Sequence, residues 1–300
     1  MNAPYLAELA DGIFGYVQPD GGWCVSNSGV LTGGGEVALV DTLATAARTI
    51  ALRTAVADLA RGPVRTVVNT HFHGDHTFGN QFFPDATLVG HRRTRAEMLG
   101  AGLGLTRLWP DVDWGPIRVT PPTVVFDDQL TLHVGDREAR LLHVGPAHTT
   151  TDVVVWLPEE RVLFAGDVLM SGCTPFVLMG SLSGSLSAVA DLARLGAEKV
   201  LCGHGPVAGA EVFEENLDYL RWIRETAEEG WRAGLPPLEL ARRTELGRFR
   251  ELRDPERLVA NLHRAYAELD GAPPGAELDV VAAFGELTAF AGGRPPVCYA

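Results

Sequence analysis

The segment Thr70-His71-Phe72-His73-Gly74-Asp75-His76 places three imidazoles and one carboxylate in a single tight loop. It directly follows the run Val67-Val68-Asn69, which predicts a buried strand that ends just before the loop. Side chains of this kind are costly to crowd together unless a cation compensates them. The spacing HxHxDH therefore indicates a metal site at the end of a strand.

Three more residues of ligand type follow predicted strands further along the chain. These are His148, Asp167 and His204, in the local motifs GPAHT, AGD and GHG. Loops at strand ends are where an α/β scaffold gathers active-site side chains from distant sequence positions. We therefore expect these three residues to join the HxHxDH loop at one site.

The chain resembles the metallo-β-lactamase superfamily over about residues 10 to 210, through HxHxDH, GxxHTxxD at Gly145 to Asp152, AGD at 165–167 and GHG at 203–205. The resemblance implies an α/β fold, an αββα sandwich with the site at one edge of its two sheets. It also implies two bound metal ions. The first would be held by His71, His73 and His148, the second by Asp75, His76 and His204, and Asp167 would bridge both.

The last ninety residues differ from the rest of the chain in their pattern of apolar residues. Apolar residues at helical spacing from Val212 to Ala227 predict one long helix, and shorter helices are predicted after it. We therefore expect a catalytic domain at residues 1–210 and a C-terminal helical region at 211–300, packed on that domain. A binding or structural protein that kept this fold would be expected to lack metal ligands, whereas all seven ligand types are present.

The ligand set predicts hydrolysis. Two divalent ions lower the pKa of a shared water, so metal-bound hydroxide can attack an ester, thioester or amide without a serine or cysteine nucleophile. We expect Asp75 and Asp167 to be catalytic as well as metal-binding. The mixed His/Asp set suits two Zn²⁺ ions, and ligand type alone leaves iron and manganese open.

Two further acids are candidates to orient a ligand imidazole through its second nitrogen, as metal-bound histidines usually require. Asp41 closes a predicted strand and Asp152 follows His148 in the chain. Ordinary capping or turn formation explains either residue about as well.

Four aromatic residues, Trp23, Trp109, Trp114 and Phe176, are candidates to line a cleft for a flat, apolar substrate. Packing in the core explains them equally well. Their segments resemble the second-ring cyclases of bacterial aromatic polyketide pathways, the actinorhodin type. This resemblance implies ring closure and thioester hydrolysis on an acyl-carrier-protein-bound intermediate. The alternative is a glyoxalase II-like thioesterase, a lactonase or a β-lactamase acting on a small molecule.

The net charge, the apolar segments and the cysteine spacing limit which partners and which location we expect. The net charge of −13 repels phosphate backbones, so we expect no nucleic-acid partner. The sequence has no secretory signal and no apolar run long enough to span a bilayer, and its four cysteines show no metal-site spacing. We expect a cytoplasmic protein with reduced thiols and without a membrane partner, and a homodimer is the assembly to test.

Overall fold

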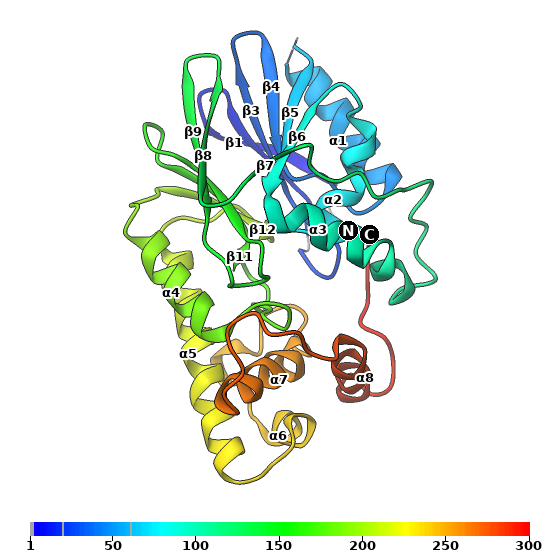
Figure 1. The fold of residues 1–300 in the computed structure, drawn as a ribbon, viewed down its shortest axis with the longest axis vertical. Coiled ribbons are helices and arrows are strands. Elements are labelled where there is room, and N and C mark those ends of the chain that lie inside the picture. Colours follow the sequence, from blue (N-terminus) through cyan, green and yellow to red (C-terminus); the bar gives the residue numbers. More distant parts are fainter. Residues whose placement is uncertain (1–2, 20, 61) are drawn as a thin grey trace.

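The computed structural model describes residues 3–19, 21–60 and 62–300, and two β-sheets form its centre (Figure 1). Within these residues the larger sheet has its strands in chain order: β1 (Tyr5–Ala10), β2 (Ile13–Val17), β3 (Ser28–Gly33), β4 (Glu36–Val40), β5 (Val64–Asn69), β6 (Thr87–His91) and β7 (Val124–Phe126). The smaller sheet has the order β12-β11-β10-β9-β8, with bounds β8 (Gln129–Val134), β9 (Arg137–His143), β10 (Val153–Leu157), β11 (Val162–Met170) and β12 (Lys199–His204).

The two sheets pack face to face through apolar side chains that alternate along their strands. Leu31 and Val40 of the larger sheet share one buried cluster with Val155, Phe164 and Leu201 of the smaller sheet. Each fully buried side chain of this size contributes about 1.5–3 kcal/mol to folding. The predicted two-sheet α/β sandwich is therefore confirmed.

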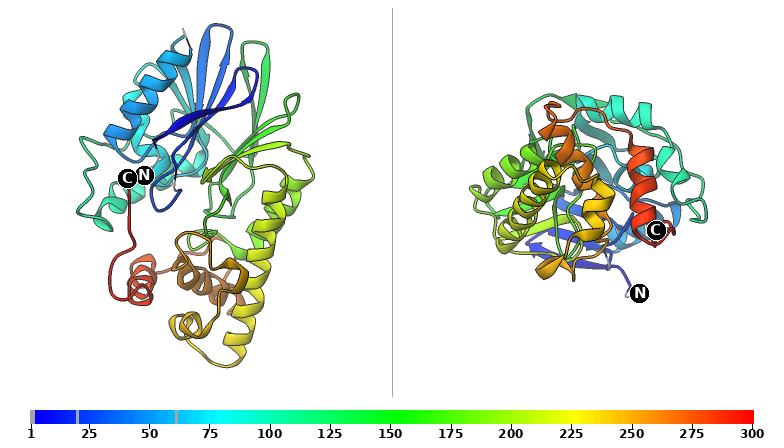
Figure 2. Two further views of the ribbon diagram at one scale, coloured as in Figure 1. Left: turned by 180° about the vertical axis from the view of Figure 1, so that it is seen from behind. Right: turned by 90° about the horizontal axis from the view of Figure 1, so that it is seen from below.

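Helices cover the outer faces of the sandwich, and further helices follow β12 (Figures 1 and 2). Their bounds are α1 (Ala46–Leu59), α2 (Gly74–Thr77), α3 (Arg92–Ala101), α4 (Leu182–Ala193), α5 (Glu211–Arg232), α6 (Pro237–Arg243), α7 (Arg257–Leu269) and α8 (Val280–Phe290), with 3₁₀ turns at Phe78–Phe82, Gly104–Arg107 and Gly247–Phe249. On the outer face of the larger sheet, Leu52 and Val56 of α1 pack against Leu39 and Val67. None of the helices in the described ranges has the length and apolar character needed to cross a bilayer.

The C-terminal helices pack on one another and on the smaller sheet. Side chains of α5, α7 and α8 share one apolar cluster with Leu163 and Val200 of the smaller sheet. Helix α8 also reaches an aromatic residue near the start of the chain, since the Phe284 ring centroid lies 5.6 Å from that of Trp23. The predicted division at residue 210 stays a prediction, although α5 does begin at Glu211.

One local expectation needs correction. Asp167 is expected to follow the end of a strand, whereas β11 continues to Met170. The strand pairing shifts around Gly166, whose φ of +51° is left-handed, so Asp167 lies within an irregular strand.

Candidate metal centre

The HxHxDH loop joins the end of β5 to α2 at one edge of the sandwich. His71 and His76 are essentially inaccessible to solvent, and Asp75 is only slightly exposed. His73 is half-buried and faces the cavity described below. The loop therefore presents four metal-ligand side chains within a small, mostly dry volume.

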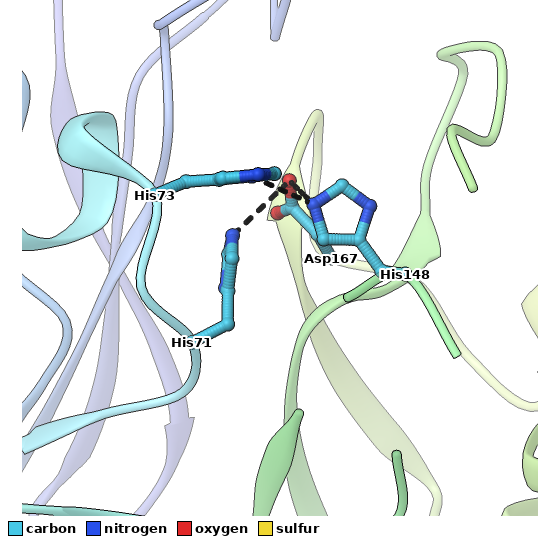
Figure 3. A group of neighbouring side chains, drawn as sticks. All are labelled: His71, His73, His148 and Asp167. Carbon is cyan, nitrogen blue, oxygen red and sulfur yellow. Dashed lines mark hydrogen bonds and ion pairs between the residues drawn. The ribbon is translucent and has the colours of Figure 1, made fainter. Parts of the chain in front are cut away.

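The structure brings all seven predicted ligands together. One group comprises His71, His73, His148 and Asp167, and another comprises Asp75, His76 and His204; within each group the ligand atoms lie within 4.8 Å of one another. Figure 3 shows the three imidazoles of the first group pointing toward the Asp167 carboxylate.

Asp167 lies between the two groups. Its Oδ2 is 3.3 Å from His148 Nε2 in the first group and 3.5 Å from His204 Nε2 in the second. Its Oδ1 is 3.2 Å from His76 Nε2. A carboxylate with one oxygen available to each side is what a bridging metal ligand requires.

Hydrogen bonds on the far side of three rings fix their orientation. Nδ1 of His148 donates to the Phe176 carbonyl at 2.6 Å, and Nδ1 of His204 donates to the Gly21 carbonyl at 3.1 Å. Nδ1 of His76 lies 2.9 Å from Asp41 Oδ2. Because each ring uses Nδ1 outward, its Nε2 faces the cluster, as metal-bound histidines require.

Some atoms of the cluster lack partners of good geometry among the described residues. These are Nε2 of His71, Nε2 of His76 and Oδ1 of Asp167, all buried. A buried polar atom without a hydrogen bond costs about 1–3 kcal/mol, so native proteins rarely leave several side by side. Bound divalent cations would satisfy all three atoms, and the donor set therefore fits metal.

The pKa values of the histidines also fit a site that binds metal. Burial lowers the pKa of His71 well below its usual range and that of His73 to about 3, so both rings are neutral and keep a lone pair for a metal. Burial also acts to lower the pKa of His204, but the carboxylates of Asp167 and Asp75 outweigh it and raise this pKa to about 9. Without metal, protons offset the buried carboxylates; bound cations would take their place.

Comparison with known proteins agrees with this geometry. The family model described as the metallo-beta-lactamase superfamily matches residues 21–204, which include every predicted ligand. The chain belongs to this superfamily. A solved structure, the metallo-beta-lactamase from Pontibacter korlensis, shares the fold with a TM-score of 0.61 at 19% identity, over 73% of this chain and 99% of that one.

Three proteins that are similar in sequence to this chain are named for three different activities. The acyl-coenzyme A thioesterase MBLAC2 of Homo sapiens is 30% identical over 53% of this chain, and the metallo-beta-lactamase type 2 of Bacteroides fragilis is 26% identical over 74%. The hydroxyacylglutathione hydrolase of Rhodospirillum rubrum is 32% identical over 46%. The matches cover 62%, 88% and 47% of these relatives, so the chain spans less than two thirds of the thioesterase and of the glutathione-linked hydrolase.

Asp41 has the orienting position that its place at a strand end suggested. Besides the contact with His76, its Oδ1 accepts from the Thr70 amide at 2.7 Å and its Oδ2 from the Thr70 hydroxyl at 2.6 Å. The carboxylate thus fixes both a ligand ring and the start of the metal-binding loop.

Replacing Asp41 with asparagine should weaken zinc binding by about 10- to 100-fold, because the His76 ring loses its charged acceptor. Competition with a chromophoric zinc chelator measures the change. Asp127→Asn, an exposed carboxylate paired with Arg92, is the matched control and should bind zinc as the wild type does. Equal zinc affinity in the Asp41 variant and the wild type would contradict the orienting role.

For Asp152 the structure agrees with the second alternative, turn formation, rather than with orientation of an imidazole. The Asp152 carboxylate accepts hydrogen bonds from the Ala147 amide at 3.1 Å, the Thr149 amide at 2.9 Å and the Thr149 hydroxyl at 2.6 Å. The acceptor for the His148 ring is the Phe176 carbonyl instead. Asp152 therefore shapes the backbone of the loop that carries His148 and does not orient the imidazole.

A cavity of about 560 Å³ opens onto the metal-ligand cluster. Its walls include Trp23, Phe72, Phe176 and Phe284, and its floor includes cluster residues of both ligand groups. Two of the four predicted substrate contacts, Trp23 and Phe176, thus line it.

The other two predicted substrate contacts, Trp109 and Trp114, lie behind the residues that line the cavity. Within the described residues that line the cavity, Trp109 and Trp114 do not occur. Trp109 packs against Trp23 with ring centroids 5.6 Å apart, and Trp114 packs against Phe78 at 6.1 Å. Both are core residues, because their indoles are covered by the rings that face the cavity.

Four lining residues come from the C-terminal helices and were not predicted: Arg257 of α7 and Val280, Val281 and Phe284 of α8. Phe284 of α8 contributes an aromatic ring, and Arg257 of α7 lies with its guanidinium carbon 4.3 Å from the centre of the Trp23 ring. The sequence offers only a weak signal for either residue: Arg257 precedes an apolar helical stripe, where arginine is uncommon.

Proposed function

We propose that this protein is a dinuclear zinc thioesterase that releases a bulky, apolar acyl chain from an acyl carrier protein. The acyl group is an aromatic polyketide intermediate, and a ring of it closes before release. The apolar cavity of about 560 Å³ directly above the metal-ligand cluster carries the proposal. A cavity of this size with aromatic walls suits a flat, apolar molecule of drug-like dimensions.

The seven ligands would hold two Zn²⁺ ions, with His71, His73 and His148 around one, Asp75, His76 and His204 around the other, and Asp167 between them. When bound, such ions supply Lewis acidity at the thioester carbonyl and make a water acidic enough to lose its proton near neutral pH. The relative named as an acyl-coenzyme A thioesterase supports thioester cleavage as the reaction class.

The chain's own residues orient the substrate and exclude water. Trp23, Phe176 and Phe284 would enclose the acyl chain, so that its thioester carbonyl lies over the cluster. The Asp75 side chain lines the same cavity and can accept a hydrogen bond from a water aimed at that carbonyl. Ring closure needs an enolate oxygen held near positive charge, which the metal ions that His73, His148 and Asp167 would help to hold could supply at the cavity floor.

Product analysis by mass spectrometry tests this function. The zinc-loaded protein is offered an aromatic polyketide-like thioester, a glutathione thioester and a β-lactam, each beside a His73→Ala control. We expect cyclised or hydrolysed product from the first substrate alone, and none in the control. Turnover of only the small thioester or the lactam would refute the polyketide assignment.

A second candidate is hydrolysis of a small glutathione thioester, which the relative named hydroxyacylglutathione hydrolase favours. The glutathione moiety carries several charges, whereas the cavity wall is mostly apolar; of its two arginines, Arg107 and Arg257, the second is already paired with Asp254. The apolar acyl chain therefore fits this cavity better.

Replacing Phe284 with alanine should lower kcat/KM for the bulky aromatic thioester about tenfold, because one aromatic wall of the cavity is lost. Steady-state kinetics with the bulky and the glutathione thioester measures the ratio. Phe290→Ala, on the same helix but outside the residues described as lining the cavity, is the matched control. An equal loss for both variants would point to general damage to α8 rather than to substrate contact.

A further inference from the structure

Two of the cysteines meet although they stand near opposite ends of the chain. Cys24 is buried and lines the cavity beside Trp23. Cys298 is half-buried, and its segment reaches the surroundings of Cys24: the Trp109 ring, which packs on that of Trp23, donates a hydrogen bond to the Pro296 carbonyl two residues before Cys298. Both are free thiols.

Contacts on both sides hold the C-terminal segment against the first part of the chain. The Trp109 indole donates to the Pro296 carbonyl at 2.7 Å, and the Arg48 guanidinium of α1 donates to the Tyr299 carbonyl. Figure 1 shows this segment, drawn in red, running from α8 back toward the sandwich. The approach of Cys298 to Cys24 is therefore fixed by neighbouring hydrogen bonds rather than by the thiols alone.

We propose that Cys24 and Cys298 form a reversible intramolecular disulfide when the protein meets a low-molecular-weight disulfide. The Cys298 thiolate attacks one sulfur of that disulfide and releases one equivalent of thiol. The Cys24 thiolate then attacks the Cys298 sulfur and releases the second equivalent. Two protein thiols are oxidised, one small disulfide is reduced to two thiols, and the atoms and electrons balance.

The surroundings of the cysteines favour this pair over the others. The hydrogen bond from Cys24 lowers the pKa of the Cys298 thiol, and Cys298 is partly accessible, as an attacking thiol must be. Burial raises the pKa of Cys24 as it does those of Cys173 and Cys202, so the partly accessible Cys298 is the thiol that attacks first, and Cys24 reacts second because the C-terminal segment is held beside it. Cys173 and Cys202 are buried and should remain reduced.

The disulfide would connect the C-terminal segment covalently to the cavity wall. Val280, Val281 and Phe284 of α8 line the same cavity, and α8 directly precedes this segment. Oxidation would therefore restrict movement of α8 away from the cavity. The inference does not depend on which substrate the cavity binds.

Thiol counting and peptide mapping on the full chain test the site. After incubation with glutathione disulfide and then denaturation, iodoacetamide should label two cysteines where the reduced protein has four. Mapping under non-reducing conditions should find one peptide pair joined through Cys24 and Cys298, and dithiothreitol should restore all four thiols. Amide hydrogen exchange in residues 291–300 should be slower in the oxidised protein.

Single substitutions separate the pair from the other thiols. Cys298→Ser and Cys24→Ser should each abolish the cross-link, whereas the matched control Cys173→Ser should keep it. The Cys298 variant changes only the terminal segment, so the test holds even where the Cys24 variant does not fold. A stable glutathione adduct on Cys298 with Cys24 still free, pairing with another cysteine, or no reaction would each overturn the proposal.

Discussion

Replacing Asp167 with asparagine should lower kcat/KM for thioester hydrolysis by about 10²- to 10⁴-fold. The Asp167 carboxylate contacts histidines of both ligand groups, and its side chain is about 5% exposed. Removing one partner from a buried set of charges costs about 3–5 kcal/mol, and each 1.36 kcal/mol lost from transition-state stabilisation is tenfold in rate. The substituted amide has the same shape but brings no negative charge between the two groups.

Metal content and kinetics measured on the same preparation distinguish the causes of this loss. We expect Asp167→Asn to retain less than the wild-type zinc content by plasma mass spectrometry. Asp136→Asn, an exposed residue of the β8–β9 turn, is the matched control and should keep both zinc and activity. Full zinc content with wild-type kinetics in the Asp167 variant would show that the carboxylate does not bridge the groups.

The metal-ligand set was predictable because its signals are local. HxHxDH is one continuous loop, and its placement after a strand follows from the apolar run that precedes it. The position of Asp167 inside β11 was not predictable in the same way. The strand continues to Met170 by pairing with β12, whose His204 faces Met170 in the register, and this partner is distant in the sequence.

The cavity was predicted only in part because its walls depend on packing between distant segments. Trp23, Trp109 and Trp114 have similar local sequence surroundings, rich in Gly and Pro, yet only the first lines the cavity. Which of these tryptophans lines the cavity depends on Phe284, which packs against both Trp23 and Trp109 from a helix near the end of the chain. No periodicity within either segment encodes this contact.

Arg257 should be the residue of the C-terminal helices whose loss costs the most stability. It is 2% exposed, pairs with Asp254 at 2.9 Å and donates to the Thr174 carbonyl at 2.9 Å. Its guanidinium also covers the Trp23 ring. Alanine would leave the carboxylate and the carbonyl unpaired and open a void beneath the indole, which together should cost about 3–5 kcal/mol of unfolding free energy.

Urea denaturation followed by tryptophan fluorescence measures this loss. Arg250→Ala is the matched control, because Arg250 is exposed and pairs with Glu251 only at the surface, and it should change the unfolding free energy by less than about 0.5 kcal/mol. Arg257→Lys should recover little of the loss, since an ammonium cannot serve Asp254 and Thr174 while it stacks on Trp23. A lysine variant as stable as the wild type would mean that positive charge alone is needed at this position. In the expected case, the planar guanidinium joins α7 to the aromatic wall, so the stability of the C-terminal helices and the shape of the cavity depend on the same side chain.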